Sequence, residues 1–524
     1  MKRRSFLAAA GGVALAAPHV KAAGAARVLR FVPYVEPAVL DPVANTAAQV
    51  RNHAFLVWDT LYGLDQDYAP QPQMVAGHTV EADGRLWTLT LRDGLRFHDN
   101  TPVLARDAVA SLRRWAAVDG FGAVLMAATD ELSAPDDRTI RFRLKQPFPL
   151  LPAALGKMSP NVPVVMPERL AGTPPTRAVA EIVGSGPFRF VASERVAGSR
   201  LVYERFDGYV PRPDGSVGFT SGPKVARLDR VEWTVMPEAA TDADALRAGE
   251  VDWWEAATPD LLPLLRADAG VKVAVLDRTG VMPVLRFNCL HPPFDNAAIR
   301  RAVLSALNQQ EFLQAFSDDA SLWRTPAGAF PPGTPMASDA GLDALAHPVG
   351  VDDARGAIAA AGYGGERVVV LGPSDHPVNS VMAQVGADLL KRLGFNVDYQ
   401  AMDAPTMFQR RANRDGVNKG GWSCFPSAVA GIDTLDPAVS FLVRGNGKDA
   451  WYGWPDDPAL ERARLLWFSA PDEPARRAAA ADIQRELLSF APHLPLGQVL
   501  QPAAFRSTLK GVLTGFPKFW SVST

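Results

Sequence analysis

Between residues 297 and 401 the sequence alternates between helix and strand patterns, and this order limits the folds that the chain can adopt. Apolar side chains recur at helical spacing from Ala297 to Phe316, and an apolar strand pattern follows at Val368–Leu371. A second helix pattern covers Val381–Leu393, and a second strand pattern covers Val397–Ala401. Helix, strand, helix and strand in this order predict an α/β layer in which helices cover a sheet.

The first half of the chain carries strand patterns of a different kind. Leu86–Leu91 and Thr139–Leu144 alternate polar and apolar residues, which predicts strands with one buried face. The stretch from Pro147 to Pro175 is rich in proline and predicts loops with short helices. A chain of 524 residues is expected to form two or three domains.

The N-terminus has the pattern of an export signal. Lys2, Arg3 and Arg4 precede an apolar stretch, Phe6–Ala17, which is shorter than the roughly 20 residues that span a bilayer. We therefore expect residues 1–22 to be a signal peptide cleaved near Ala22, with a frayed helix as the alternative. Arg3-Arg4 resembles the twin-arginine export signal. This pattern predicts a mature protein located in the periplasm.

Composition and motifs exclude several classes of function. Removing residues 1–22 leaves 50 basic and 56 acidic side chains, a net charge of −6, whereas nucleic-acid-binding proteins are usually basic. Two cysteines cannot form a disulfide-rich scaffold or a cysteine-based zinc cluster. The motifs HExxH, GxSxG and GxxxxGK[ST] are absent from the sequence. We therefore assign no catalytic residue, metal ligand or cofactor, and expect binding rather than catalysis.

A series of short motifs covers the chain from about residue 27 to residue 500. They are, in order, Leu40-Asp41-Pro42, Asp83–Asp99, Gly184–Phe188, Gly249–Asp252, Phe287-Asn288, Ala360–Tyr363 and Gly420–Trp422. Each motif alone is common, but their number and order resemble one family, the extracellular solute-binding proteins of family 5. Its members are the peptide- and nickel-type periplasmic binding proteins of ABC importers.

The resemblance implies a two-lobed α/β fold with a hinged cleft. Lobe I would combine residues 27–59, 183–280 and 499–524, and an extra domain, residues 60–182, would decorate it. Lobe II would span residues 281–498. The protein would act as a monomer that captures a peptide or peptide-like solute between the lobes. It would then make transient contact with the permease subunits of the importer in the membrane.

The resemblance also implies where the ligand would bind. Because a buried polar solute needs partners for its polar groups, we expect the cleft to combine aromatic walls with a few charges. Trp253 and Trp254 are adjacent on a strand and should point to opposite faces, so that one could face the cleft. The candidate ligand-binding residues are Glu36, Ser185, Trp253, Trp254, Asn288, Lys419, Gly421, Trp422, Ser423 and Asp433.

The ligand class stays open at this point. Peptide-binding relatives carry an aspartate for the ligand amine three residues after the tryptophan of Gly-Trp, where this chain has Phe425. Asp433 is the alternative, but it lies eleven residues beyond Trp422, which favours loss of the conventional amine site. A metal chelate, a sugar or an aromatic compound could then replace a peptide, and an exported hydrolase or a sensory role are further alternatives.

The two cysteines are candidates for a disulfide. The resemblance places the segments of Cys289 and Cys424 next to each other, and a few family members join nearby positions by a disulfide. Two separate buried thiols are the alternative and the reading that we favour. A bond would require Cα atoms within about 7 Å of each other.

Overall fold

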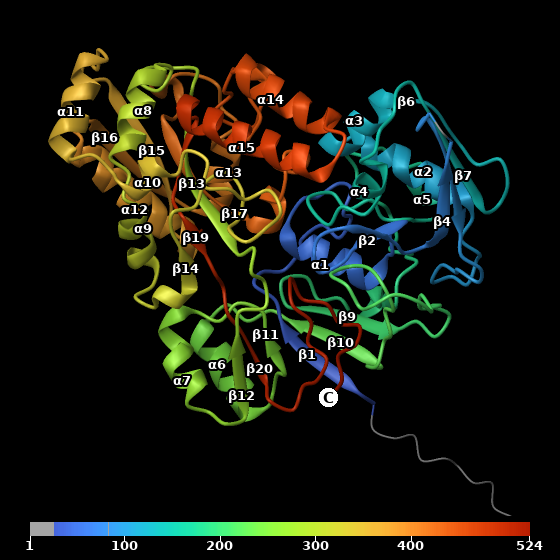
Figure 1. Cartoon of the computed structure of the whole chain (residues 1–524). Coiled ribbons are helices and arrows are strands. Elements are labelled where there is room, and N and C mark those ends of the chain that lie inside the picture. Colours follow the sequence, from blue (N-terminus) through green and yellow to red (C-terminus); the bar gives the residue numbers. More distant parts are fainter. Residues whose placement is uncertain (1–25, 82) are drawn as a thin grey trace, which may run out of the picture.

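The computed structural model describes residues 26–81 and 83–524 (Figure 1). The expected signal peptide lies outside the described residues and stays a prediction. No helix among the described residues is both long enough and apolar enough to cross a membrane.

The first sheet is built around β1 near the start of the described chain. β1 lies between β10 and β11 and runs parallel to both, whereas β9 and β20 add antiparallel strands on the two sides. The strand order is β12-β20-β11-β1-β10-β9-β8. The bounds are β1 Val28–Val32, β8 Phe188–Phe190, β9 Arg200–Arg205, β10 Arg230–Thr234, β11 Trp253–Trp254, β12 Val271–Ala274 and β20 Ala503–Arg506. Strands far apart in the sequence therefore share one sheet.

Each face of the first sheet is covered by a different layer. Val32 and Trp254 pack with the helices α6, Ala239–Ala248, and α7, Leu262–Arg266. Phe31 and Trp253 point the other way, into the large core that includes α1. Alternation of side chains along a strand produces this division.

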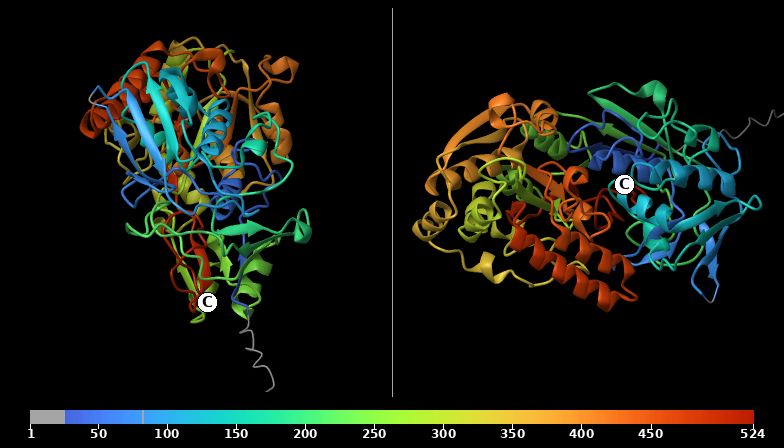
Figure 2. Two further views of the ribbon diagram at one scale, coloured as in Figure 1. Left: turned by 90° about the vertical axis from the view of Figure 1, so that its right-hand side faces the viewer. Right: turned by 90° about the horizontal axis from the view of Figure 1, so that it is seen from above.

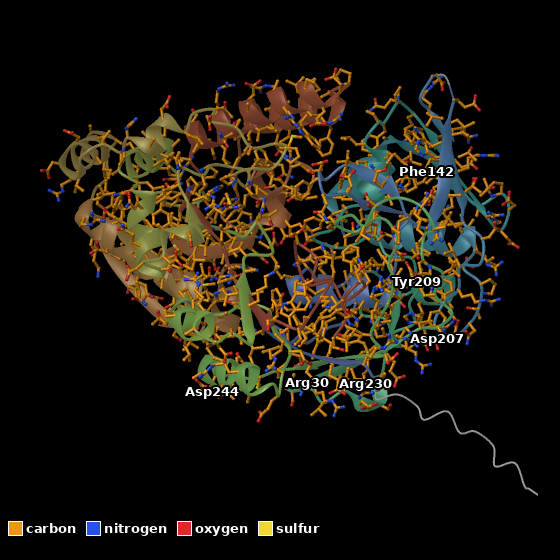
Figure 3. The ribbon with its side chains drawn as sticks, turned by 60° about the horizontal axis from the view of Figure 1, so that its bottom comes forward. Arg30, Phe142, Asp207, Tyr209, Arg230 and Asp244 are labelled. Atoms are coloured by element: carbon orange, nitrogen blue, oxygen red, sulfur yellow. The ribbon has the colours of Figure 1, made fainter. Side chains whose placement is uncertain are left out.

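One solvent-facing edge of the molecule, beside the central strands β1 and β10, carries paired charges. Arg30 on β1 binds Asp252 at 2.9 Å, and Arg230 on β10 binds Glu194 and Glu232, each at 2.6 Å. Figure 3 labels Arg30 and Arg230 at this edge. Ion pairs of this exposed kind contribute about 0–1 kcal/mol each, so they keep this surface polar more than they stabilise it.

The second sheet is built around β13. β17 pairs antiparallel along its whole length, and the parallel strands β15 and β16 follow beyond β17. The path is β14-β19-β13-β17-β15-β16, with β18 also pairing β13. The bounds are β13 Val281–Phe287, β14 Trp323–Arg324, β15 Arg367–Pro373, β16 Asn396–Met402, β17 Cys424–Ala430, β18 His493–Pro495 and β19 Gln498–Val499.

Helices cover the second sheet, as the α/β pattern predicts. Those around it are α8 Ala297–Ser305, α9 Gln309–Phe316, α10 Asp343–Ala346, α11 Val351–Ala360, α12 Pro377–Arg392, α13 Ala404–Arg410, α14 Pro458–Ser469 and α15 Glu473–Phe490. The sequence predicts one helix over Ala297–Phe316, and that prediction is wrong. The chain breaks between α8 and α9 because Asn308 caps α9, its side chain accepting a hydrogen bond from the Gln310 amide at 3.1 Å.

A smaller antiparallel sheet lies beside the first sheet. Its order is β4-β5-β7-β6, and the predicted strands Leu86–Leu91 and Thr139–Leu144 are its β5 and β7. β2 and β3 form a hairpin before it. The remaining bounds are β2 Tyr62–Leu64, β3 Pro70–Pro72, β4 Val75–Val80, β6 Thr129–Ser133, α2 Ala105–Ala116, α3 Gly120–Ala128, α4 Leu151–Leu155 and α5 Glu168–Ala171.

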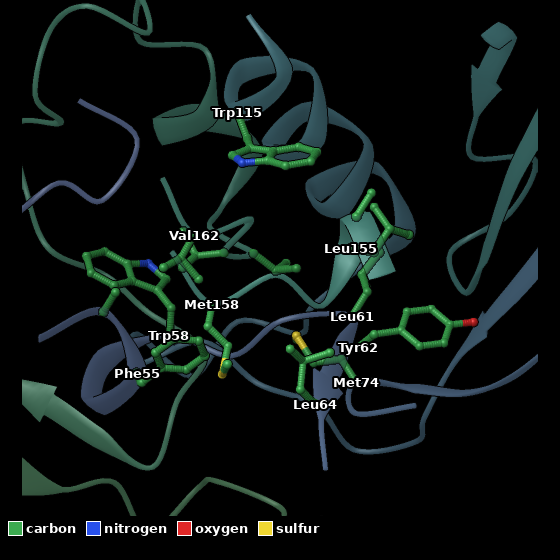
Figure 4. Packing of buried hydrophobic residues seen from close by; sticks show 14 of the residues in the cluster. Phe55, Trp58, Leu61, Tyr62, Leu64, Met74, Trp115, Leu155, Met158 and Val162 are labelled. Carbon is green, nitrogen blue, oxygen red and sulfur yellow. The ribbon is translucent and has the colours of Figure 1, made fainter. Parts of the chain in front are cut away.

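Helix α1, Ala48–Val57, packs tightly against the segment that follows α4. Figure 4 shows Phe55 and Trp58 at the end of α1 beside Met158 and Val162 of that segment, and all four side chains are buried. The Trp58 indole also donates a hydrogen bond to the Val183 carbonyl at 3.2 Å. This packing fixes the position of α1 relative to residues 158–162.

The described chain passes between the first and second sheets at two segments, residues 275–280 and 500–502. The Gly431 amide donates a hydrogen bond to the Gly280 carbonyl at 2.6 Å, and the Gln498 side chain donates to the Thr279 carbonyl at 2.7 Å. Away from these crossings, α14 reaches over to α3, as the view from above in Figure 2 shows. There the rings of Phe121 and Phe468 lie 6.0 Å apart.

We expect His53 to make the fold sensitive to acid. The His53 ring is buried on α1 next to the Tyr203 hydroxyl, 2.9 Å away, and burial lowers its pKa from about 6.5 to about 3. The unfolded chain therefore binds a proton at this residue at higher pH than the folded chain does. Its contribution to stability is present above pH 6.5 and is lost as the pH falls toward 3.

Between pH 7 and pH 5 this loss is about 2 kcal/mol of unfolding free energy. Urea unfolding of the wild type and of His53→Gln at both pH values measures it, because the other buried histidines are common to the two proteins. An equal pH dependence in both proteins would contradict this account of His53.

Candidate functional site

Arg51 on α1 has one side of its guanidinium group without a partner. Its Nε and Nη2 donate to the Asn52 side-chain oxygen at 3.3 and 3.2 Å, and the group lies 4.6 Å from the centre of the Phe516 ring. The residue is only 7% exposed, and Nη1 has no hydrogen-bond partner within the described part of the chain. Arg51 is thus held by its neighbours while one donor stays unused.

Asp433 lies near Arg51 but belongs to the turn that follows β17 of the second sheet. It lies in the short turn Gly431–Thr434 directly after β17, and it is 9% exposed. Burial raises the pKa of the Asp433 carboxyl, and the nearby Arg51 charge lowers it. The two side chains therefore lie within electrostatic range of each other, although Oδ1 of Asp433 meets no hydrogen-bond partner among the described residues.

Ser159 completes the group from the segment after α4. It is 2% exposed and lies near enough to Asp433 to lower the pKa of that carboxyl. It also lines a recess together with Arg51, Asn45 and Asn161. Its hydroxyl faces the Asp433 carboxylate, although the contact falls outside ordinary hydrogen-bond geometry among the described residues. We call Arg51 Nη1, Ser159 Oγ and Asp433 Oδ1 the three open atoms.

The other charged groups around the three open atoms are engaged by neighbours. The Glu255 carboxylate accepts hydrogen bonds from the Tyr34 amide at 2.7 Å and from the Asn52 side chain at 2.8 Å. Asp277 accepts from the amide and the hydroxyl of Thr279 at 2.9 and 2.7 Å. These carboxylates bind the local backbone. Two buried ammonium groups also lie within electrostatic range, Lys157, which pairs with Asp119, and Lys518, which donates to the Thr514 carbonyl.

Three buried polar atoms in one place need a physical explanation. Most buried polar groups in proteins have a hydrogen-bond partner, and leaving one unpaired costs about 1–3 kcal/mol. The three open atoms come from α1, from the segment after α4 and from the second sheet, so the place lies where three parts of the chain meet. The recess that Arg51 and Ser159 line is too small for a water molecule in this structure, so a solute could enter only if the surrounding parts moved apart. No cluster of His, Cys, Asp or Glu suited to a metal ion occurs in the described residues.

Comparison with known proteins assigns the chain to a family. The model of the bacterial extracellular solute-binding proteins, family 5 Middle, matches residues 69–450. The chain belongs to this family of solute-binding proteins. A relative from Sinorhizobium fredii, a probable peptide ABC transporter periplasmic-binding protein, is 35% identical over 92% of this chain and 91% of its own.

Solved structures of solute-binding proteins confirm the two-lobed α/β fold. The periplasmic binding protein AgaA of Agrobacterium tumefaciens R10, in complex with agropinic acid, is 21% identical and superposes with a TM-score of 0.77 over 94% of this chain and 98% of its own. DppA of Helicobacter pylori, in complex with the peptide STSA, is 20% identical with a TM-score of 0.77 over 95% and 98% of the two chains. The resemblance read from the sequence motifs is therefore confirmed.

The two adjacent tryptophans are core residues of this solute-binding protein. Trp253 and Trp254 point to opposite faces of the first sheet, as expected, but they are only 0% and 3% exposed. Trp253 packs near Phe31 and Phe519, with ring centres 5.5 and 5.7 Å apart. The expectation that one of them could face an open cleft is not met, because both faces of the sheet are covered by apolar layers.

The predicted residues around Trp422 form one connected part of the second sheet. The Asn288 side chain donates to the Trp422 carbonyl at 2.9 Å, and the Ser423 hydroxyl accepts from the Val369 amide at 3.0 Å. Gly421 lies against the Asp415 carbonyl with no room for a side chain. These residues order the strand ends, whereas Lys419 is exposed beside them.

Glu36 follows β1 and Ser185 precedes β8, and both side chains bind backbone groups. The Glu36 carboxylate accepts from the Gly198 amide at 2.6 Å. The Ser185 hydroxyl donates to the Val165 carbonyl at 3.0 Å and accepts from the Asp59 amide at 3.1 Å. Of the ten predicted residues, Asp433 is the one that we place among the three open atoms.

Phe425 occupies an aromatic cluster of the second lobe. It is fully buried, with its ring centre 4.9 Å from that of Trp422 and 5.5 Å from that of Trp451. Asp433 lies beyond the end of the same strand. Because a strand rises about 3.3 Å per residue, an acid at position 433 cannot reach the place of residue 425.

Both cysteines are free thiols among the described residues. Cys424 lies opposite Phe287 on the neighbouring strand, and the Cys289 amide donates to the Gly453 carbonyl at 2.9 Å. The reading of two separate thiols agrees with the structure, and the alternative of a disulfide does not. Burial raises the pKa of both thiols, which makes them poor nucleophiles.

Reasoning from the sequence missed Arg51 and Ser159. A signal for Arg51 was present, because Gln49, Arg51, Asn52 and His53 are polar residues within a helix that is buried on nearly every side. A buried helix with this many polar residues must satisfy them through specific partners. Ser159 carries no comparable signal, since serine is common in proline-rich loops.

The unpaired carboxylate at position 433 makes a prediction about stability. Asp433→Asn removes a buried charge, so we expect the ligand-free protein to gain about 0.5–2 kcal/mol of unfolding free energy, as substitutions at strained functional sites do. Asp41 is a matched buried aspartate, but its carboxylate pairs with Arg114 at 2.7 Å. Asp41→Asn should cost about 3–5 kcal/mol.

Denaturant unfolding of the two variants at pH 7 measures these changes of opposite sign. A loss of stability in Asp433→Asn as large as that in Asp41→Asn would show that Asp433 supports the fold rather than a ligand.

Proposed function

We propose that this protein is the solute-binding component of an ABC importer and that it takes up a peptide or peptide-like solute between its two lobes. The observation that carries this proposal is the family match over residues 69–450, and the buried Arg51 and Asp433, each with one polar atom that lacks a partner among the described residues, support it. A buried, polar and unsatisfied place between two sheets is suited to hold a small polar molecule. The peptide-binding names of its relatives support the choice of solute.

We further propose that the protein binds its solute without chemical change and without a cofactor, and that it acts as a monomer. The absence of chemical change fits the raised pKa values of the two buried thiols, because neither cysteine is an activated nucleophile. Its partners would be the solute and, transiently, the permease subunits of the importer.

Movement of the two lobes would let the solute enter. The first and second sheets are joined by the crossing segments 275–280 and 500–502, which fits hinge closure about a pair of connecting segments. We take residues 27–59, 183–280 and 499–524 as lobe I, residues 60–182 as the extra domain that moves with it, and residues 281–498 as lobe II. Contacts away from the crossings, such as Phe121 with Phe468 and Tyr34 with His376, would then form on closure.

A second candidate is a solute that is not an ordinary peptide. Phe425 fills the position where peptide-binding members are expected to carry an aspartate, and it is packed inside lobe II. The solved relative that binds agropinic acid shows that this fold accepts other molecules. The amine of such a solute would need a different partner from that of a conventional peptide.

Closure on a solute predicts a gain in stability and a loss of size. With the mature protein at a ligand concentration of about 100 times Kd, binding should add about 2.7 kcal/mol to the unfolding free energy. Native mass spectrometry identifies the solute that co-purifies, and small-angle scattering with and without it should show a smaller radius of gyration when it is bound. A tightly bound solute that leaves the radius of gyration unchanged would contradict the hinge.

We propose that the protein reaches the periplasm through the twin-arginine pathway. The support is Arg3-Arg4 ahead of a short apolar stretch that ends near Ala17. Replacing both arginines by lysine should cause the uncleaved precursor to accumulate in the cytoplasm. Immunoblotting of cell fractions measures the amounts of precursor and mature protein. Normal yield in the periplasm would exclude this pathway and leave general secretion as the route.

A further inference from the structure

The extra domain and lobe II meet directly, on the side of the molecule away from the crossing segments. Figure 1 shows the end of α14 next to α3, and the rings of Phe468 on α14 and Phe121 on α3 lie 6.0 Å apart with their planes at 60°. Aromatic pairs in this range attract each other beyond the area that they bury. The contact is therefore a second connection, without a covalent bond, between two bodies that a hinge would separate.

Each ring of this pair is anchored in its own body. Phe121 is 2% exposed and packs near Phe148 of the extra domain, with ring centres 6.4 Å apart. Phe468 lies 5.3 Å from the ring of Trp467, whose indole donates to the Met336 sulfur at 3.4 Å within lobe II. Phe121 and Trp467 belong to one hydrophobic core. Separation of the two bodies would expose apolar surface of both to water, which costs free energy.

Arg444, in the segment between β17 and α14, lies directly on the start of α3. A Cβ atom at Gly120, the first residue of α3, would lie 2.2 Å from Arg444 Nη2 and 3.0 Å from its Cζ. The backbone of Gly120 does not have a positive φ that would itself require glycine. The close approach of the guanidinium group accounts for the glycine at this position.

The Arg444 charge lies between two acids, one in each body. Burial lowers the pKa of the Arg444 guanidinium, and the nearby carboxylates of Asp119 in the extra domain and Glu461 on α14 raise it. Asp119 caps α3 by accepting from two backbone amides at 2.9 and 2.8 Å, and Glu461 accepts from the Gly445 amide at 2.6 Å. Both acids are thus fixed in place, and Arg444 is a cation that attracts both of them across the interface.

We propose that Phe121, Phe468 and Arg444 form a latch that holds the extra domain against lobe II and keeps part of the protein closed even without a solute. This inference rests on the proposed function only through the hinge. Every contact of the latch joins protein groups, so the latch favours the closed form with and without a solute. A larger closed population raises the affinity for a solute that contacts both lobes.

The test measures the closed population of the mature protein after bound solute has been removed in urea and the protein refolded. Nitroxide labels on Arg141→Cys in β7 and Ala478→Cys in α15, both at exposed positions, report the distance between the extra domain and lobe II by pulsed electron paramagnetic resonance. The two native thiols have raised pKa values and react slowly with the label. We expect two distances, of which the shorter one belongs to the closed form.

Two substitutions open the latch without changing any residue of the three open atoms. Phe468→Ala removes the ring pair and should lower the ratio of closed to open protein about 5-fold. Gly120→Ala places a methyl group where the Arg444 guanidinium lies and should lower the ratio at least about 2-fold. Alanine favours a helix more than glycine does, so Gly120→Ala does not weaken α3 itself.

Gly356→Ala and Leu465→Ala are the matched controls. A Cβ atom at Gly356 on α11 meets nothing within 4 Å, and Leu465 is a large apolar residue on α14 that is 66% exposed. Both controls should show the distances of the wild type. Denaturant unfolding of all four variants shows whether each keeps its fold, and Gly120→Ala tests the latch even if Phe468→Ala does not fold.

The outcomes separate the latch from the proposed function. Wild-type protein that shows only the longer distance once solute is removed would overturn the latch. A Gly120→Ala variant that folds and keeps the wild-type distances, or controls that shift as far as the latch variants, would overturn it as well. Uptake of a solute is tested independently by native mass spectrometry of the co-purified solute, so either proposal can fail while the other stands.

Discussion

The covalent connection between the two large sheets limits what the rest of the structure can do. Within the described chain, the sheets are joined at residues 275–280 and 500–502, and hydrogen bonds from Gly431 and Gln498 tie the second sheet to the first of these segments. Between the sheets, apolar side chains of both parts of the chain pack in one hydrophobic core, which includes Phe55 on α1 and Ile432 after β17. Polar groups are tolerated there if a bound molecule can pair them, and this is where Arg51 and Asp433 lie.

The largest hydrophobic core contains residues of both large parts of the chain, such as Phe55 and Ile432, whereas a second core belongs to the second sheet and its helices. In lobe I, Phe31 and Trp253 pack with Phe519, and in lobe II, Phe425 packs with Trp422. The cores are rigid platforms that position α1 and the turn after β17. Two predicted ligand-binding residues take part in this packing, since Trp254 belongs to the apolar layer with α6 and α7 and Asn288 donates to the Trp422 carbonyl.

The sequence was sufficient for the fold and insufficient for the site. Alternating strands such as Leu86–Leu91 and Thr139–Leu144 were predicted with their observed bounds, because their pattern is local and one face is buried. The motif order identified the family, since each motif marks a turn or strand end that the fold requires. The break at Asn308 was missed because one capping side chain outweighed a regular helical pattern.

The residues of the site could not be found in the same way. Arg51, Ser159 and Asp433 are separated by more than a hundred residues from one another, and their proximity depends on how three parts of the chain pack. Family motifs directed attention to strand ends around Trp422, where the aromatic cluster fills the space. Unpaired buried atoms, which only a three-dimensional structure can reveal, indicated the place between the lobes.

A crystal structure of the mature protein with its co-purified solute tests the central claim most directly. The account predicts electron density for the solute between the lobes, with polar atoms within about 3 Å of Arg51 Nη1, Ser159 Oγ and Asp433 Oδ1. Density for the solute elsewhere, with Arg51 and Asp433 still lacking partners or paired directly with each other, would contradict it.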